Sequence, residues 1–307
     1  SGPLGHTFDE TFTDDTLGQK SWERAEAKML ERAADLALSK AKVYADGVDV
    51  FLGGDLLNQI VSSGYTARQL GIPFLGLYGA CSTMAESLLL GAMLIDGGFA
   101  DTALCATCSH FSTAERQYRF PLELGNQRTP TAQWTVTGAG ATLLGRESPL
   151  PLCIESVTIG SVWDLKQTDA NNMGAAMAPA AMQTLKSHLD DLHRIPEDYD
   201  LIVTGDLGRV GYDLMKLLCR KEGIELDQRY IDCGCEIFDV SQDVHSGGSG
   251  CGCSAVSLNG WLLGRMLKGE IRKMLFLATG ALMSPTMSQQ GESIPGVAHA
   301  VSLEVMP

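Results

Sequence analysis

Hydrophobic positions recur along the chain with two periods, one typical of amphipathic helices and one of short buried strands. Residues 21–40 place Ala25, Met29 and Leu36 on one helical face, with charged side chains on the others. Residues 82–96 are apolar almost all round, which predicts a helix buried in the interior. The pattern therefore predicts both surface helices and a central one.

Short apolar runs between the helical segments predict β-strands. We expect strands at residues 48–52, 73–78, 102–107, 139–144, 153–159, 201–204 and 273–278. Three further helices are expected at residues 179–192, 210–220 and 254–267. Pro179 would then stand in the first turn of its helix, where its missing N–H does no harm. Helices that alternate with strands are typical of an α/β fold with a mostly parallel sheet covered by helices.

An internal repeat divides the chain into two similar halves. The segment 49–56 matches 200–207, with Gly-Asp-Leu at the end of both segments. Cys81-Ser82 matches Cys253-Ser254, and 104–107 matches 276–279, and these two matches share one larger offset. Two matches at one offset favour a duplicated α/β unit. We expect a first half over residues 1–150 and a second half over 151–307, with the insertion that the larger offset requires between 208 and 252.

Composition narrows the possible functions. The 307 residues carry 23 Lys and Arg against 37 Asp and Glu, a net charge of −14, which excludes a basic nucleic-acid binder. No apolar run reaches the ~18 residues that span a bilayer, and no secretory signal opens the chain. Nine cysteines, an odd number, favour free thiols in a reducing compartment. The chain is expected to be a soluble protein of a cytosol-like compartment.

Cys81 is the principal candidate for chemistry. It follows a predicted strand and a Gly-Ala turn, at the start of the buried helix. Unpaired N–H groups and the helix dipole at such a place would lower the thiol pKa, as a nucleophile requires, and would also bind a carboxylate. The alternative is a small buried cysteine that only packs beside a tight turn.

The other cysteines are weaker candidates. Cys233 and Cys235 together with Cys251 and Cys253 supply four sulfurs, but a single residue between paired ligands is tight for zinc. Cys105 and Cys108 fall on or just beyond a strand, so they are not expected to form a redox pair. The sequence predicts no metal site, no phosphate-binding loop and no cofactor.

Longer strings carry a family resemblance. These are Gly-Gly-Asp-Leu-Leu-Asn-Gln at 53–59, Tyr-Gly-Ala-Cys-Ser-Thr at 78–83, Ser-His at 109–110 with Thr-Ala-Glu-Arg-Gln at 113–117, Met-Ala-Pro-Ala-Ala at 177–181, Gly-Gly-Ser-Gly-Cys at 247–251, and Ala-Thr-Gly-Ala-Leu at 278–282 with Ser-Pro-Thr-Met at 284–287. With them the chain resembles the stage V sporulation protein AD family of the thiolase-like superfamily. The resemblance implies two pseudo-equivalent α/β halves packed in αβαβα layers. It also implies binding of dipicolinic acid (pyridine-2,6-dicarboxylate) during uptake into the developing spore and release in germination.

The resemblance also implies what this chain lacks. Condensing enzymes of this fold use the cysteine together with a His and an Asn from the second half. The corresponding positions here are 204–207, without His, and Gly250-Cys251, without Asn, so we expect a protein without catalysis. The family fold begins with a strand that precedes residues 1–4, so the first half is expected to lack its leading strand.

Ligand-binding candidates gather at the helix start and in the glycine-rich loop. An acidic protein must hold a dianion with amide N–H groups, local cations or Ca²⁺ carried with the ligand. His188 and His193 are expected at the surface, whereas His299 is left open between pocket and core. The candidates are Cys81, Ser82, Thr83, His110, Asp206, Gly248, Ser249, Gly250 and Cys251, with Arg116, Arg128 and Arg209 as possible cations.

Three function classes stay open at this stage. A binding protein for dipicolinic acid or its calcium chelate needs an intact pocket beside Cys81 and no chemistry. A Cys81-dependent acyltransferase or condensing enzyme needs an oxyanion hole and a base, and a structural assembly subunit needs only an interface. The resemblance further implies a peripheral place at the cytosolic face of the forespore or spore inner membrane, with other stage V sporulation membrane proteins as partners. It also implies a homodimer through the strand that ends near Thr107.

Overall fold

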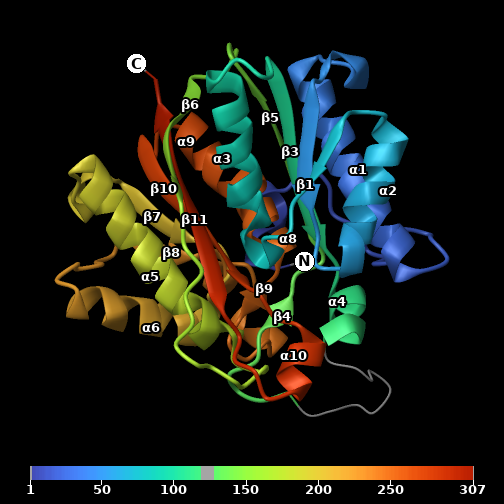
Figure 1. Ribbon diagram of the computed structural model, residues 1–307. Coiled ribbons are helices and arrows are strands. Elements are labelled where there is room, and N and C mark those ends of the chain that lie inside the picture. The colour runs from blue at the N-terminus through green and yellow to red at the C-terminus, as the bar shows by residue number, and fades with distance from the viewer. Residues whose placement is uncertain (1, 119–127, 307) are drawn as a thin grey trace.

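The computed structural model describes residues 2–118 and 128–306. Two large β-sheets stand side by side and alternate with three layers of helices (Figure 1). The first sheet has the order β2-β1-β3-β5, from β1 (Val50–Gly54), β2 (Phe74–Gly76), β3 (Thr102–Ser109) and β5 (Gly138–Gly145). The second has the order β6-β11-β10-β7-β8, from β6 (Leu152–Ile159), β7 (Leu201–Thr204), β8 (Tyr230–Asp232), β10 (Lys273–Ala281) and β11 (Gly296–Val305).

Helices cover both outer faces and fill the space between the sheets (Figure 1). The helices α1 (Trp22–Ala41) and α2 (Val61–Leu70) pack on the first sheet, and α5 (Met173–Leu192) and α6 (Gly208–Lys221) on the second. The central layer contains α3 (Thr83–Asp96) and α8 (Cys251–Val256). The predicted αβαβα layering is thus confirmed.

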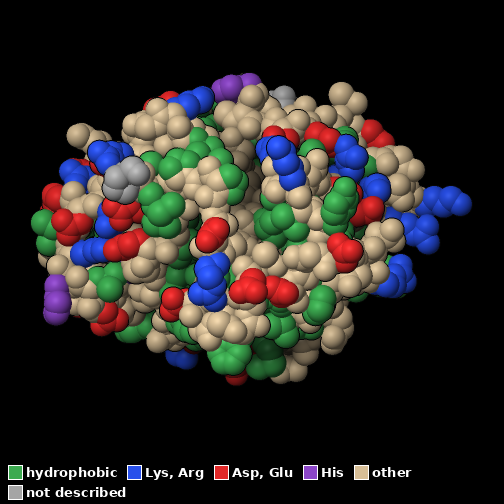
Figure 2. All heavy atoms as spheres, turned by 90° about the horizontal axis from the view of Figure 1, so that it is seen from above, with side chains coloured by type: hydrophobic (Ala, Val, Ile, Leu, Met, Phe, Trp, Pro, Cys, Tyr) green, Lys and Arg blue, Asp and Glu red, His purple; other side chains and the backbone are tan. Residues whose placement is uncertain are grey.

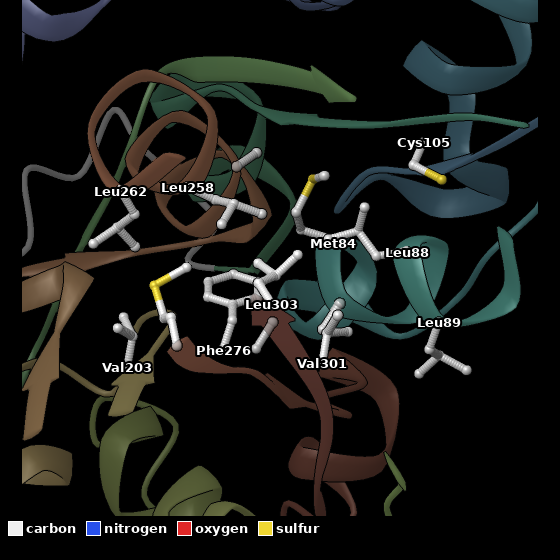
Figure 3. Packing of buried hydrophobic residues seen from close by; sticks show 14 of the residues in the cluster. Met84, Leu88, Leu89, Cys105, Val203, Leu258, Leu262, Phe276, Val301 and Leu303 are labelled. Atoms are coloured by element: carbon white, nitrogen blue, oxygen red, sulfur yellow. The ribbon is translucent and has the colours of Figure 1, made fainter. Parts of the chain in front are cut away.

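The main core lies in this central layer. Met84 and Leu88 of α3 point toward Phe276 of β10 and Val301 of β11, and all four are at most 2% exposed (Figure 3). Burial of such side chains stabilises the fold by about 1.5–3 kcal/mol each. The helix predicted as apolar all round is therefore the central one. Figure 2 shows acidic and basic side chains interspersed over the face seen from above.

Equivalent aspartates mark the duplication in three dimensions. Asp49 precedes β1, and its Oδ2 accepts hydrogen bonds from the N–H groups of Asp101 and Thr102 at 2.8 and 2.9 Å. Asp200 precedes β7, and its Oδ2 accepts them from Arg272 and Lys273 at 2.8 and 3.0 Å. The two aspartates stand at the spacing that the first sequence match predicts. The residues that donate to them, Asp101 and Arg272, are equivalent in the same way. Their separation along the chain is one residue shorter than the separation of Cys81 and Cys253.

The larger offset of the sequence match is therefore wrong by one position. Strand pairing sets Leu52 against Cys105 and Val203 against Phe276, again at the shorter spacing, and both partners face the central core. A shift of one residue would turn these side chains to opposite faces of their sheets. The counterpart of Cys81 is accordingly Gly252, not Cys253.

The edges of the sheets differ between the halves. β6 pairs with β11 at one edge of the second sheet, whereas no described strand lies beyond β5 in the first. The division at residue 150 falls between β5 and β6 and stays a prediction. β3 is enclosed between β1 and β5 and offers no free edge, and the homodimer through this strand stays a prediction.

Two helices begin at other residues than the sequence analysis predicts. α5 begins at Met173 with Asn172 as its cap, so Pro179 lies inside the helix and not in its first turn. Interior proline costs about 3 kcal/mol, which burial of most of this helix offsets. The helix predicted at 254–267 begins earlier, at Cys251, and passes through a π-helical segment (Ser257–Leu262) into α9 (Leu263–Leu267).

The remaining elements are short and gather at one end of the sheets in Figure 1. No helix of the described residues is long and apolar enough to cross a bilayer. The short elements are α4 (Phe111–Tyr118), β4 (Trp134–Thr135), α7 (Cys233–Glu236), β9 (Gly248–Ser249) and α10 (Pro285–Gln289).

Candidate functional site

A hollow opens where the carboxyl ends of the parallel strands meet the start of α3. It encloses about 480 Å³ free of protein atoms, open solvent included, and about 40 Å³ of this is wide enough to hold the centre of a water molecule. Such a place beyond the strand ends is where open α/β sheets bind ligands. The described residues that line it are Leu56, Ala80, Cys81, Ala114, Glu115, Tyr118, Thr135, Met173, Ser249, Ala281 and Met283.

A tight turn presents Cys81 to the hollow. The backbone of Ala80 adopts φ 52°, a left-handed conformation that costs a non-glycine residue about 1–2 kcal/mol. Ser82 Oγ donates to the Gly79 carbonyl at 2.7 Å, and Thr83 Oγ1 donates to the Ala80 carbonyl at 2.6 Å. A Cβ at Gly280 would lie 2.2 Å from the Gly79 oxygen, so only glycine fits there. The turn is thus held from both halves of the chain.

The Cys81 thiol is protonated in this setting. Burial raises its pKa well above the ordinary value, and the neighbouring Asp206 carboxylate, Cys251 and a hydrogen bond to Asp206 raise the pKa further. The Gly250 N–H opposes this shift. The lowered pKa expected from the helix start is therefore wrong, because burial of the thiol, and after it the Asp206 carboxylate, outweigh the helix dipole.

Asp206 connects the two halves beneath the hollow. It follows β7 and is fully buried. Its Oδ2 accepts from the Gly250 N–H at 2.9 Å, and its Oδ1 accepts from Thr279 Oγ1 at 2.7 Å. Burial raises the pKa of Asp206 to about 6, against the lowering effect of these donors, Cys81 and Ser249. The carboxylate therefore occupies the N-terminus of α8 and is ionised at neutral pH.

The structure brings several predicted residues to the hollow. Cys81 and Ser249 line it, while Asp206 and Gly250 lie directly behind them. Cys251 is buried and its Sγ lies 2.9 Å from the Cys108 carbonyl.

Ser82 and Thr83 are also buried, and their hydroxyls are used by the turn. Gly248 pairs with Trp134 between β4 and β9, and its carbonyl accepts from Gln133. These three residues therefore support the wall of the hollow rather than line it.

The cationic candidates lie elsewhere. His110 is fully buried, its Nε2 lies 2.9 Å from the Asp15 carbonyl, and its Nδ1 accepts from the Ser112 N–H. Arg116 forms an ion pair with Glu23. Arg209 is exposed on α6, and Arg128 stacks on Trp134 at 4.2 Å. None of these four residues is among the described residues that line the hollow.

Two further histidines are structural. His188, expected at the surface, is fully buried. Thr158 Oγ1 and Tyr199 OH lie 2.7 Å from its two ring nitrogens, so both polar atoms have partners there. His299 accepts from the Gly160 N–H at 3.2 Å, and burial lowers its pKa to about 4.

Sequence reasoning missed the lining from α4 and from the loop after β1. Tyr118 OH donates to the Leu56 carbonyl, which closes one wall. The same loop holds Gln59 and Ile60 at φ 59° and 44°. Left-handed backbone at a β-branched residue is rare and marks strain, which clusters at functional sites. The string at 53–59 is the one signal of this loop in the sequence.

No group of three metal-ligating side chains is found among residues 2–118 and 128–306. Cys233 and Cys253 are free and fully buried.

Comparison with known proteins identifies the family. The family model for stage V sporulation protein AD (SpoVAD) matches residues 1–304. Stage V sporulation protein AD of Bacillus subtilis (strain 168) is 48% identical over 303 residues, which cover 99% of this chain and 89% of that protein.

Solved structures show the fold. Human mitochondrial 3-ketoacyl-CoA thiolase in complex with CoA matches with a TM-score of 0.64 at 14% identity, over 95% of this chain and 94% of that chain. The 3-oxoacyl-[acyl-carrier-protein] synthase III of Aquifex aeolicus VF5 matches with a TM-score of 0.60 at 14% identity, over 91% and 84%. This chain therefore belongs to the stage V sporulation protein AD family and has the thiolase-like fold.

Proposed function

We propose that this sporulation protein binds dipicolinic acid in the hollow beside Cys81 and forms no covalent bond with it. Binding of this kind would support uptake of the acid into the developing spore and its release in germination. The observation that carries the proposal is the protonated Cys81 thiol, which borders the hollow with its pKa raised by burial and by Asp206. A thiol in this state packs against a ligand but is a poor nucleophile.

The lining suits a flat aromatic acid. Leu56, Ala114, Met173 and Met283 supply apolar surface for the ring faces, and methionine adapts well to aromatic partners. Ser249 supplies a polar contact at the rim. The ligand enters either as the acid or as its calcium chelate, and Ca²⁺ would then arrive with it.

Acyl transfer by Cys81 is the second candidate, since the thiolase-like neighbours include condensing enzymes and the cysteine stands at the hollow. Acyl transfer requires a cysteine thiolate and free hydrogen-bond donors for an oxyanion. Asp206 disfavours the thiolate, and it already accepts the hydrogen bond of the Gly250 N–H. A structural assembly subunit is the third candidate and requires no ligand.

For its cellular place we propose the cytosolic face of the forespore or spore inner membrane, as a peripheral partner of other stage V sporulation membrane proteins. A homodimer would use a free sheet edge such as β2, where Leu75 is 52% exposed and Tyr78, just beyond the strand, is 62% exposed.

Calorimetry with dipicolinate, with and without Ca²⁺, tests the proposal on the wild type and on Cys81→Ala. Binding is expected to survive the substitution, and mass spectrometry after incubation with acyl-CoA is expected to find no adduct. An adduct on Cys81 would establish acyl transfer instead. Absence of binding to the folded protein would leave the assembly subunit.

A further inference from the structure

The hollow is too narrow in this structure for a ligand of the proposed size. Only about 40 Å³ of it can hold the centre of a water molecule. One water needs about 10–15 Å³ on this scale, whereas pockets for small molecules measure about 300–1,000 Å³. A part of the wall must therefore move before a planar ring with two carboxyl groups can enter.

Much of the wall is tied down by hydrogen bonds. The turn of Cys81 is held from both halves of the chain, as described above. The carbonyl of Ser249 accepts from the Val136 N–H at 2.9 Å, which fixes β9 beside the chain that follows β4. The carbonyl of Leu56 accepts from Tyr118 OH. These parts cannot move without leaving buried polar groups unpaired, which is costly.

One segment of the wall lacks such ties. Residues 283–292, which we name the lid, leave the second sheet after β10 and lead back toward β11. At the base of the lid, the Leu282 N–H donates to the Pro295 carbonyl at 2.8 Å. Within the described part of the chain, the hydrogen bonds of the lid join only residues of the lid itself, and α10 at its centre has no buried residue. A segment with so few ties to its surroundings opens at a low cost in free energy.

The two ends of the lid differ in their packing. Met283 is half-buried, lines the hollow and packs against the core of the second half, as Met173 does. At the other end Gly291 has φ 85°, and no atom lies within 4 Å of the place of a Cβ. A turn that glycine adopts freely, in open space, can serve as a hinge. Figure 1 shows α10 at the end of the sheets where α4 and β4 lie.

We propose that the lid lifts to admit the ligand and that Met283 is the residue that closes the hollow again. For the identity of the ligand this inference rests on the proposed function, whereas the motion of the lid does not. Methionine is unbranched and flexible, so its side chain can leave the hollow and then pack on the ring of the ligand. Met283 thus regulates access to the site and takes no part in chemistry.

Labelling of Cys81 by methyl methanethiosulfonate, a small neutral thiol reagent, tests the lid without any ligand. Cys81 borders the hollow and is 7% exposed, so its labelling rate depends on how often the hollow opens. Met283→Ala is expected to raise this rate about tenfold at constant pH, with Cys153 on β6 as the internal reference. An unchanged rate in this variant would overturn the inference.

Met287→Ala is the matched control. Met287 also lies on the lid, but it is 47% exposed and is not among the described residues that line the hollow. Its replacement is expected to leave the labelling rate of Cys81 unchanged. The same acceleration in both variants would show that Met283 does not close the hollow.

Hydrogen exchange on the wild type shows whether the lid itself moves. The amides of the lid are expected to exchange at least about tenfold faster than those of β10 and β11, and dipicolinate is expected to slow them. Exchange in the lid as slow as in the two strands would overturn the inference, because Met283→Ala would then only have widened a rigid hollow.

Calorimetry with dipicolinate separates this inference from the proposed function. Binding that leaves the exchange of the lid unchanged would refute the lid and leave the proposed function standing. Absence of binding, with or without Ca²⁺, while labelling and exchange behave as expected, would refute the proposed function and leave the lid standing.

Discussion

Replacing Asp206 by Asn should stabilise the fold more at neutral pH than at acidic pH. Asp206 is fully buried, and burial raises its pKa from 3.8 to about 6. The folded state therefore holds this proton more tightly than the unfolded chain does. The resulting stability is fully present below pH 3.8 and is lost as the pH rises to about 6.

The size of the effect follows from the shift. About two pKa units at about 1.36 kcal/mol each amount to about 3 kcal/mol that ionisation of Asp206 costs the fold at neutral pH. Between pH 5 and pH 7.5 the fold loses about 1.4 kcal/mol of the stabilisation that protonated Asp206 provides. Asn has nearly the same shape, and its carbonyl can still accept from the Gly250 N–H, but it never ionises. The free energy of unfolding of the variant relative to the wild type should thus rise by this amount over the same interval.

Urea unfolding followed by circular dichroism at pH 5, 6 and 7.5, at constant ionic strength, measures this difference. Asp213→Asn, which removes an exposed charge on α6, corrects for the general loss of one negative charge. A difference between Asp206→Asn and the wild type that stays constant across the three pH values would refute the reasoning. It would mean that water or a counter-charge reaches Asp206 in the folded protein.

Three other outcomes follow from the same structure. Iodoacetamide at pH 8 should modify Cys81 more slowly than the partly exposed Cys153, as measured by peptide mass spectrometry. Asp206→Asn should accelerate the reaction at Cys81, and equal rates in wild type and variant would contradict the role of the carboxylate. Phe276→Ala should lower the free energy of unfolding by about 3–5 kcal/mol in urea titrations, because it empties the central core, and a loss under about 1 kcal/mol would contradict that packing. His188, whose pKa burial lowers to about 4, should make the fold lose stability as the pH falls from 6.5 to 4, and thermal unfolding of His188→Gln should lack this part of the acid sensitivity.

The sequence predicts the layers better than the register. Burial on both sides leaves near-continuous apolar runs at most strands, so hydrophobicity alone predicts their positions. It misses β8 and β11, for which the sequence analysis predicts no strand. Alignment of the repeat on identical letters sets Cys81 on Cys253. Strand pairing and the aspartates Asp49 and Asp200 show that the true equivalent is Gly252. A duplicated fold preserves backbone geometry more strictly than side-chain identity. An alignment of the two halves on identical residues can therefore be wrong by one position.

Sequence reasoning locates the centre of the candidate site and misses its rim. Cys81 stands at the start of a helix that the apolar pattern makes visible. α4 is short and mostly polar, so neither its existence nor the contact of Tyr118 with Leu56 could be predicted from periodicity. The raised pKa of Cys81 comes first from burial and then from Asp206, which lies in the other half of the chain, and no local pattern contains either effect.

The two halves use equivalent aspartates in different ways, and this difference explains the asymmetry of the hollow. Asp55 follows β1 as Asp206 follows β7, but Asp55 accepts from the Leu57 N–H and from the N–H and hydroxyl of Ser63, all within its own half. Asp206 instead reaches across to Cys81. One aspartate thus braces the strained loop of the first half, while the other adds to the burial that raises the pKa of the Cys81 thiol. The hollow is asymmetric for this reason, because a carboxylate of the second half lies beside the cysteine of the first half, whereas Asp55 keeps its hydrogen bonds within its own half.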